Sequence, residues 1–170
     1  GLGGLLLFPL RVGAATLLLE RAPPEVLLPA IAAHRATVLF TPPTSYRAMA
    51  AQAARFDLAS LRKCVSAGEA LPPATRKLWK DATGIELIDG IGATELLHIF
   101  ITNRFGDSHP ATTGRPVAGY EAKIVDAQMQ EVKRGEVGRL AVRGPTGCRY
   151  LADARQGKYV ENGWNITGDA

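Results

Sequence analysis

Short apolar runs that predict β-strands alternate with longer runs that predict helices in the first part of the chain. The predicted strands cover residues 14–19, 37–41, 63–66 and 86–89. The predicted helices cover residues 24–34, 44–55 with Thr44 as the N-cap, and 73–83, ended by Gly84. Helices of about three turns between short apolar strands indicate βαβ units and a parallel sheet covered on both sides.

The pattern changes near residues 110–114. Helical periodicity disappears from Gly114 onward, and short runs at residues 122–125, 138–143 and 159–167 are separated by Gly, Pro, Asp and Asn. Such runs predict a small antiparallel barrel or sheet. We therefore expect an α/β fold in two parts, an α/β nucleotide- and acid-binding sub-domain at residues 1–111 and a β-rich sub-domain at residues 112–170.

The chain begins with an apolar segment, residues 1–10, that is interrupted by Pro9 and followed by Arg11. It is shorter than the ~20 apolar residues that a membrane-spanning helix needs, so we expect a buried helix or strand and no membrane partner. The chain has no initiator methionine and no helix or strand signal at its end. We expect it to be an internal fragment of a longer protein.

Composition narrows the possible functions. The 170 residues are 46% hydrophobic, enough for one sizeable core or two small ones. The 20 Lys and Arg residues are scattered and only 6% of the chain is aromatic, whereas nucleic-acid binding usually requires a clustered basic stripe with stacking aromatics. Cys64 and Cys148 have neither metal-site spacing nor a disulfide framework, which favours a reducing cytoplasm, and Cys64 fits a small buried apolar residue.

Two predicted strands lead into loops that combine glycine with a carboxylate. Gly68 and Glu69 follow the strand at residues 63–66, and Asp89 and Gly90 stand at the end of the next strand. Ligands of open parallel sheets bind beyond the carboxyl ends of the strands. We therefore expect both loops to face the same rim.

The segment after the last of these strands carries the most informative side chains. Gly90 and Gly92 lack Cβ, which permits a positive φ and the close approach of a base or phosphate. Thr94 can donate to a phosphate oxygen, and Glu95 is a hard oxygen ligand of the kind that Mg²⁺ prefers. His98 lies in an apolar run, which suits recognition of an aromatic acid and equally suits a core histidine that has found a partner.

Five short motifs extend over almost the whole chain: Ser66-Ala67-Gly68-Glu69-Ala70-Leu71-Pro72, Gly92-Ala93-Thr94-Glu95, Gly114-Arg115-Pro116, Gly135-Glu136-Val137-Gly138-Arg139-Leu140 with Val142-Arg143-Gly144-Pro145, and Gly163-Trp164-Asn165-Ile166-Thr167-Gly168-Asp169. In this order they resemble the adenylate-forming enzymes, the acyl- and aryl-CoA ligases related to firefly luciferase and to the adenylation domains of nonribosomal peptide synthetases. The stretch from Asp89 to Glu95, followed by His98-Ile99-Phe100, is most similar to benzoate and 2-aminobenzoate CoA ligases.

The resemblance implies a role for each matching residue. The catalytic residues would be Thr94, which contacts the phosphates, and Glu95, which binds Mg²⁺. The aryl-carboxylate pocket would contain Gly92, His98 and Ile99. The ATP/AMP site would contain the residues Gly68, Glu69, Ala70, Asp89, Gly90, Ile91 and Asp169, of which Asp169 would accept both ribose hydroxyls.

Some of these residues also have simpler interpretations. Glu95 could be a solvated surface carboxylate, Glu69 a loop anchor, and Asp169 a turn residue. Ile91 stands where the family often has Tyr, and the benzoate-type members share this departure.

The reaction implied by the resemblance has two steps. An aromatic carboxylate attacks the α-phosphate of ATP and releases pyrophosphate, and coenzyme A then attacks the mixed anhydride. The family's phosphate loop is expected upstream of Gly1 and its C-terminal domain beyond Ala170, so we expect the fragment alone to be inactive. Two alternatives remain, an adenylation domain that activates an acid for a carrier protein and an isolated, non-catalytic nucleotide-binding module.

Overall fold

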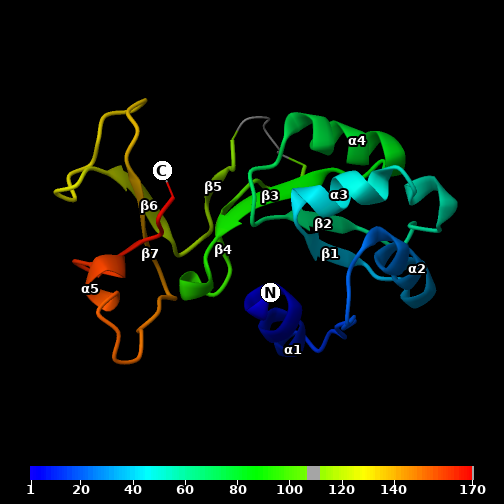
Figure 1. Cartoon of the computed structure of the whole chain (residues 1–170), viewed down its shortest axis with the longest axis horizontal. Coiled ribbons are helices and arrows are strands. Elements are labelled where there is room, and N and C mark those ends of the chain that lie inside the picture. Colours follow the sequence, from blue (N-terminus) through cyan, green and yellow to red (C-terminus); the bar gives the residue numbers. More distant parts are fainter. Residues whose placement is uncertain (107–111, 170) are drawn as a thin grey trace.

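The computed structural model describes residues 1–106 and 112–169, which form two β-sheets with helices packed against the first (Figure 1). The first sheet has the strand order β1-β2-β3-β4-β5, and the second has the order β6-β7-β9-β8. The first is parallel over β1, β2 and β3, and the second is antiparallel throughout. The predicted α/β fold with an appended antiparallel sheet is confirmed.

The strands of the first sheet are β1 (Val38–Thr41), β2 (Lys63–Ser66), β3 (Leu87–Gly92), β4 (Ile99–Thr102) and β5 (Arg115–Pro116). The sequence predicted β1 and β2 closely, whereas β3 continues past its predicted end and pairs antiparallel with β4. Both β4 and β5 were missed. An apolar run of four residues is too short for periodicity to separate strand from helix, and two residues containing a proline carry no strand signal.

One helix precedes each of the three parallel strands: α2 (Pro24–His34) before β1, α3 (Pro43–Ala50) before β2 and α4 (Pro73–Thr83) before β3. Each has proline in its first turn, where the missing N–H costs nothing. The prediction is confirmed for α2 and α4, but α3 begins at Pro43 and is followed by a separate 3₁₀ turn, η2 (Ala53–Arg55).

Thr44 is not the N-cap of α3, contrary to the sequence prediction. Pro42 occupies that position, and the Thr44 hydroxyl instead donates to Glu69 Oε1 at 3.1 Å. The side chain therefore joins α3 to the loop after β2.

The main core lies between α2, α3 and α4 and one face of the parallel strands. Leu39 and Cys64 from neighbouring strands point into it, and Tyr46 packs edge-on against Trp79 with ring centroids 5.0 Å apart. All four side chains are buried. Burial raises the pKa of the Cys64 thiol to about 12, so Cys64 behaves as the small apolar residue that the sequence predicted.

The opposite face of the sheet carries the N-terminal segment, a π-helical turn η1 (Leu2–Leu7) continued by α1 (Phe8–Arg11). Gly3 and Gly4 are buried there, and a Cβ at Gly4 would lie 3.3 Å from the ring of Phe40 on β1. The helices α2, α3 and α4 thus pack on one face, and the other face is covered by a different segment.

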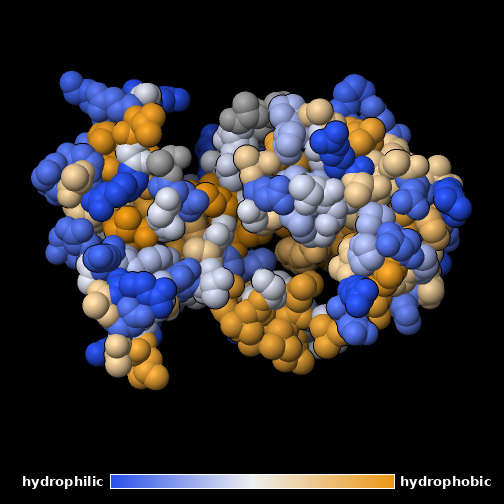
Figure 2. Space-filling view, in the orientation of Figure 1, coloured by the Kyte–Doolittle hydropathy of each residue, from blue (hydrophilic) through white to orange (hydrophobic). Residues whose placement is uncertain are grey.

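The N-terminal prediction is right about a helix and wrong about its burial. Leu2, Leu6 and Leu10 are exposed, and Figure 2 shows apolar surface gathered over this segment. Residues 14–19 have no strand pairing in the described structure, so the strand predicted there is also wrong. Apolar character alone does not make a strand when no neighbouring strand edge is within reach. Nowhere in the described ranges is a helix both long and apolar enough to cross a bilayer.

The second sheet consists of β6 (Glu121–Val125), β7 (Arg139–Arg143), β8 (Val160–Glu161) and β9 (Trp164–Ile166), with the single-turn helix α5 (Gln156–Tyr159) before β8. The strands β8 and β9 form a hairpin whose turn residues Asn162 and Gly163 both have positive φ, as the right-handed twist of two strands favours.

The two sheets share a core. Leu96 and Phe100 from the first part are buried together with Leu140 and Val142 of β7. The predicted division between the two parts stays a prediction. It falls at Ala111, which lies outside the described residues, and β5 beyond it still belongs to the first sheet.

Candidate functional site

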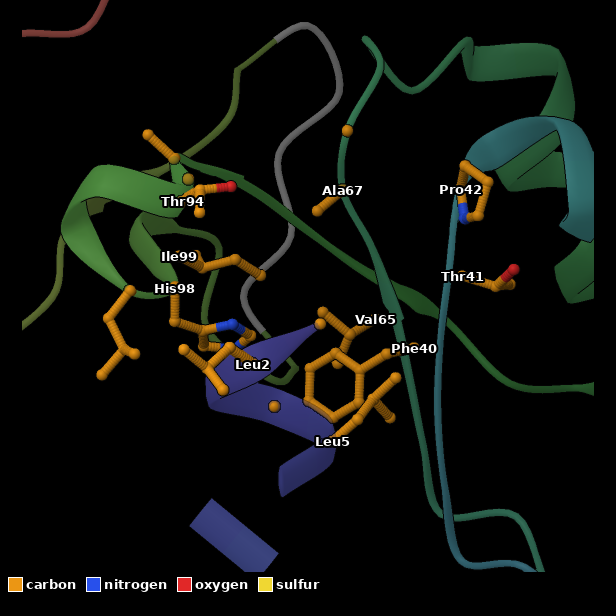
Figure 3. Close-up of a pocket in the computed structure, with 16 residues that line it drawn as sticks. Leu2, Leu5, Phe40, Thr41, Pro42, Val65, Ala67, Thr94, His98 and Ile99 are labelled. Atoms are coloured by element: carbon orange, nitrogen blue, oxygen red, sulfur yellow. The ribbon is translucent and has the colours of Figure 1, made fainter. Parts of the chain in front are cut away.

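A cavity of about 350 Å³ lies beyond the carboxyl ends of β1 and β2 (Figure 3). This volume falls in the range of roughly 300–1,000 Å³ that small-molecule sites occupy. Its walls combine the ends of β1 and β2 with the start of the N-terminal segment and the turn between β3 and β4. Five residues that the sequence assigned to the nucleotide and acid sites line this cavity together: Gly68, Gly92, Thr94, His98 and Ile99.

One wall of the cavity is an aromatic stack around His98. Phe8 and Phe40 meet the imidazole edge-on, with ring centroids 5.0 and 5.5 Å away. A Cβ on Gly3 or Gly4 would come within 2.8 Å of His98, so only glycine lets the helix approach the ring so closely. Burial lowers the pKa of His98. The wall is therefore apolar and favours the neutral imidazole.

The glycines of β3 are needed for packing. Gly90 and Gly92 are absent from the residues with positive φ, so the conformational freedom that glycine permits is not used at these positions. A Cβ at Gly90 would lie 2.7 Å from Ile99 Cγ2, and a Cβ at Gly92 would lie 2.6 Å from the carbonyl oxygen of His98. Their lack of a side chain lets β4 lie close to β3 and brings His98 and Ile99 to the cavity.

The rim of the cavity carries the polar groups. Gly68, after β2, has a φ of +93° and open space where a side chain would be. Thr94 begins the 3₁₀ turn η3 (Thr94–Leu96), and its hydroxyl points towards the loop that carries Ala67 (Figure 3). A hydroxyl and an open glycine loop face each other there, which is an arrangement suited to a phosphate or carboxylate.

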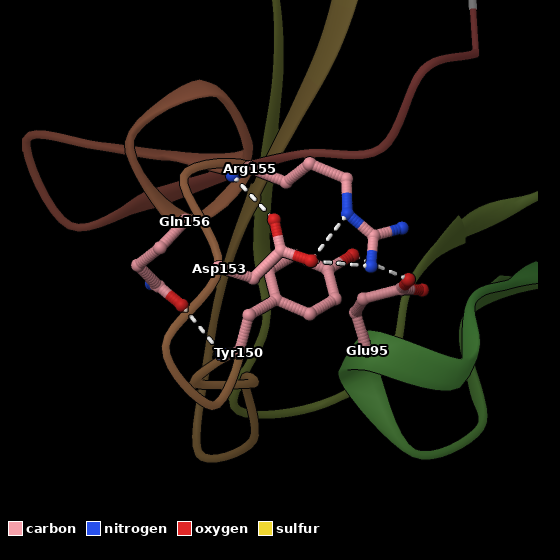
Figure 4. A network of polar contacts seen from close by, with 5 residues as sticks. All are labelled: Glu95, Tyr150, Asp153, Arg155 and Gln156. Carbon is pink, nitrogen blue, oxygen red and sulfur yellow. Dashed lines mark hydrogen bonds and ion pairs between the residues drawn. The ribbon is translucent and has the colours of Figure 1, made fainter.

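Glu95 does not line this cavity. It lies on the same turn as Thr94 but extends towards the loop after β7, where its Oε1 accepts a hydrogen bond of 2.8 Å from the Tyr150 hydroxyl (Figure 4). Tyr150 was missed by the sequence analysis, because a tyrosine 55 residues away carries no local signal of this contact.

Glu95 fits the expected role of a Mg²⁺ ligand. Within the described residues no group of three or more His, Cys, Asp or Glu side chains could hold a metal ion. Mg²⁺ commonly binds through one or two carboxylates together with substrate phosphates, and Tyr150 occupies only one of the two Glu95 oxygens. A carboxylate on the same turn as the Thr94 hydroxyl is compatible with that mode of binding, and the metal role of Glu95 stays a prediction.

Asp169 follows β9 at the end of the described chain. Its backbone oxygen accepts from the amide of Leu140, which fixes the chain after β9 against β7. Burial raises the pKa of the Tyr159 phenol, and the negative charges of Glu95 and Asp169 act in the same direction.

The remaining predicted ATP-site residues lie outside the cavity. Glu69 is held by Thr44, and Ala70 follows it in the loop after β2. Asp89 lies within β3 with its carboxyl largely buried, and burial raises its pKa. Ile91 packs against the core shared by the two sheets. Their roles at adenine stay predictions.

Phe40 is a second residue that the sequence analysis missed. It alternates with the core residue Leu39 on β1, so its side chain must point to the opposite face of the sheet. The alternation is visible in the sequence. Which face of the sheet borders the cavity is known only from the position of the N-terminal segment, which forms part of the cavity wall.

Comparisons with known proteins show the family of the chain. The family model described as AMP-binding enzyme matches residues 1–150. A benzoate–CoA ligase from Thauera aromatica is 41% identical over 86% of this chain, and an anthranilate–CoA ligase from Pseudomonas aeruginosa is 40% identical over 99%. The chain spans only 28% and 33% of the lengths of these two relatives.

A solved structure shows the same fold. The crystal structure of the anthranilate CoA ligase AuaEII in complex with anthranoyl-AMP has a TM-score of 0.92 and 42% sequence identity, and the match covers 98% of this chain and 33% of that one. Family model, sequence relatives and solved structure agree that the chain belongs to the AMP-binding enzyme family.

Proposed function

We propose that these residues are the central part of an ATP-dependent aryl-acid CoA ligase. The enzyme would adenylate benzoate or 2-aminobenzoate and form the CoA thioester, releasing AMP and pyrophosphate. The observation that carries the proposal is the cavity whose aromatic wall, around His98, leads to a polar rim at Thr94. The benzoate–CoA and anthranilate–CoA ligases among the relatives support the same class of substrate.

The residues of the cavity would have different roles in adenylation. Phe40, His98 and Ile99 would hold the aromatic ring and exclude water from it. This places the carboxylate at the rim, where the Thr94 hydroxyl would donate to a phosphate oxygen. Holding both reactants in this arrangement removes much of the entropic barrier to their reaction.

The carboxylates outside the cavity would act on the nucleotide. Glu95 would hold Mg²⁺, which supplies charge stabilisation for the phosphates when it is bound. Asp169 would accept hydrogen bonds from the two ribose hydroxyls, and the loop Gly68-Glu69-Ala70 together with Asp89, Gly90 and Ile91 would flank the nucleotide. Coenzyme A would be the second substrate, and the cytoplasm would be the compartment.

The test is an acid-dependent assay of the full-length protein that contains these residues. We expect CoA thioester formation with benzoate or 2-aminobenzoate, with AMP as a product. Rates with short aliphatic acids should be much lower, because these acids cannot fill the cavity or pack against its aromatic wall. Failure with every carboxylate tested would overturn the proposal.

Two alternatives predict different results. An enzyme that serves a carrier protein would load a phosphopantetheine arm and leave free CoA unused. A stand-alone nucleotide-binding module would show ATP affinity by calorimetry in the isolated 170 residues, without any acid-dependent reaction.

A further inference from the structure

The loop that follows β7 fastens the second sheet to the turn η3. The Thr146 hydroxyl donates to the carbonyl oxygen of Leu96 at 2.7 Å, and the Tyr150 hydroxyl donates to Glu95 Oε1 at 2.8 Å. A carboxylate can only accept, so the direction of the second bond is fixed. The loop thus contacts both the backbone of the turn and its one acidic side chain.

Tyr150 is itself held from several sides (Figure 4). Its backbone N–H donates to Gln156 Oε1 at 2.7 Å, and the Arg155 guanidinium lies over its ring at 4.9 Å. Arg155 is oriented by two hydrogen bonds of 2.9 and 2.7 Å to Asp153 Oδ2. Tyr159 meets the ring of Tyr150 edge-on at 5.8 Å. The phenol therefore has little freedom to leave Glu95.

Such a contact has a chemical consequence for a metal-binding carboxylate. Glutamate has several rotatable bonds. If its side chain becomes ordered only when the metal binds, the lost conformational entropy lowers the affinity for the metal. One oxygen of Glu95 is taken by Tyr150, which leaves Oε2 as the free ligand atom in a fixed direction.

We propose that Tyr150 is a positioning residue for Glu95, holding the carboxylate so that its second oxygen is presented to the magnesium–nucleotide complex. This inference rests on the proposed function, because it assumes that Glu95 binds the metal. It also gives the loop after β7 a role in the reaction, although that loop lies far from η3 in the sequence.

The test compares Tyr150→Phe with Tyr159→Phe in the full-length protein. Each variant removes one phenol oxygen from one of two rings in contact, but the Tyr159 hydroxyl has no hydrogen-bond partner among the described residues. The measured quantity is the dissociation constant of the complex of Mn²⁺ with a non-hydrolysable ATP analogue. Water-proton relaxation enhancement distinguishes the protein-bound complex from the same complex in solution.

We expect Tyr150→Phe to weaken Mn²⁺–nucleotide binding about tenfold, the lower end of the loss that follows removal of a partner from a metal ligand. Tyr159→Phe should leave it unchanged. In a Glu95→Gln background, Tyr150→Phe should cause no further loss, because Tyr150 acts through Glu95.

Three results would count against the inference. Unchanged or tighter binding in Tyr150→Phe would overturn it and leave the proposed function standing. An equal loss in both backgrounds would show that Tyr150 acts independently of Glu95, which also overturns it. A parent protein that binds no Mn²⁺–nucleotide at all would overturn the proposed function and this inference together.

Discussion

At the scale of single residues, Glu95 is the side chain whose chemistry can be tested most directly. Replacing it with Gln keeps its shape and removes its charge. We expect Glu95→Gln to lower the acid-dependent rate about 100-fold, as removal of one electrostatic contact in an active site often does. The exposed Glu86, which pairs with Lys80 at the far end of α4, provides the control Glu86→Gln. A Glu95→Gln rate equal to that of the control would remove Glu95 from the mechanism.

His98 provides a second prediction at this scale. Because Phe8 covers the imidazole, Phe8→Ala should let water reach it and move its pKa upward towards the ordinary value of about 6.5. The pKa is measured by an NMR titration of the histidine ring. Leu10→Ala removes a more exposed side chain from the same short helix and should leave the pKa of His98 in place. Equal titration of His98 in all three proteins would contradict the role of Phe8.

The lowered pKa of His98 also links stability to pH. In the range between its folded-state pKa and about 6.5, the unfolded chain binds more protons at His98 than the folded chain. The contribution of His98 to the free energy of unfolding is therefore complete above pH 6.5 and is lost as the pH falls through the folded-state pKa. Neutral solution favours both the fold and an uncharged aromatic wall.

At the scale of elements, the attachment of β5 to β4 depends on Gly114. This residue has a φ of +109°, and a Cβ there would lie 2.1 Å from the carbonyl oxygen of Thr102. We expect Gly114→Ala to lower the free energy of unfolding by about 2–5 kcal/mol, the sum of backbone strain and a steric clash. Denaturant unfolding of the full-length protein measures this change.

A matched control separates the two contributions. Gly135 also has a positive φ, of +95°, but open space around its Cβ position. Gly135→Ala should therefore cost only the backbone strain, about 1–2 kcal/mol. Equal losses in the two variants would show that the contact with Thr102 is unimportant.

Elements were predictable from the sequence where their signals are local. Proline at the start and a glycine or left-handed residue at the end set the limits of α2 and α4, and the apolar run of β2 is flanked by polar residues. The strand predicted at residues 14–19 failed, and β4 was missed. In both cases the deciding factor is whether another strand edge lies beside the segment, which local sequence does not specify.

At the scale of the whole molecule, the core shared by the two sheets should make them unfold together. Phe100 from the first sheet is fully buried against Leu140 and Val142 of the second. We expect Phe100→Ala to lower the free energy of unfolding of both parts by about 3–5 kcal/mol. The same substitution at Phe105, which is 63% exposed, is the control and should cost far less.

The two tryptophans can report on the two parts separately. Trp79 is fully buried in α4, and Trp164 lies on β9 beneath Lys123 and Arg143. In variants that keep one tryptophan each, we expect fluorescence to give the same unfolding midpoint for both probes, and Phe100→Ala to lower both midpoints. Different midpoints in the parent chain would show that the sheets unfold independently.

The sequence by itself determined the α/β class and the order of a parallel sheet followed by an antiparallel one, because these follow from periodicity and turn residues that are local in the chain. Only the tertiary structure decided that Gly90 and Gly92 serve close strand packing, that Phe8 and Phe40 enclose His98, and that Tyr150 binds Glu95. These contacts join segments far apart in the chain. Which residues meet in these contacts depends on how whole helices and strands pack together. The residue spacing within one segment does not determine it.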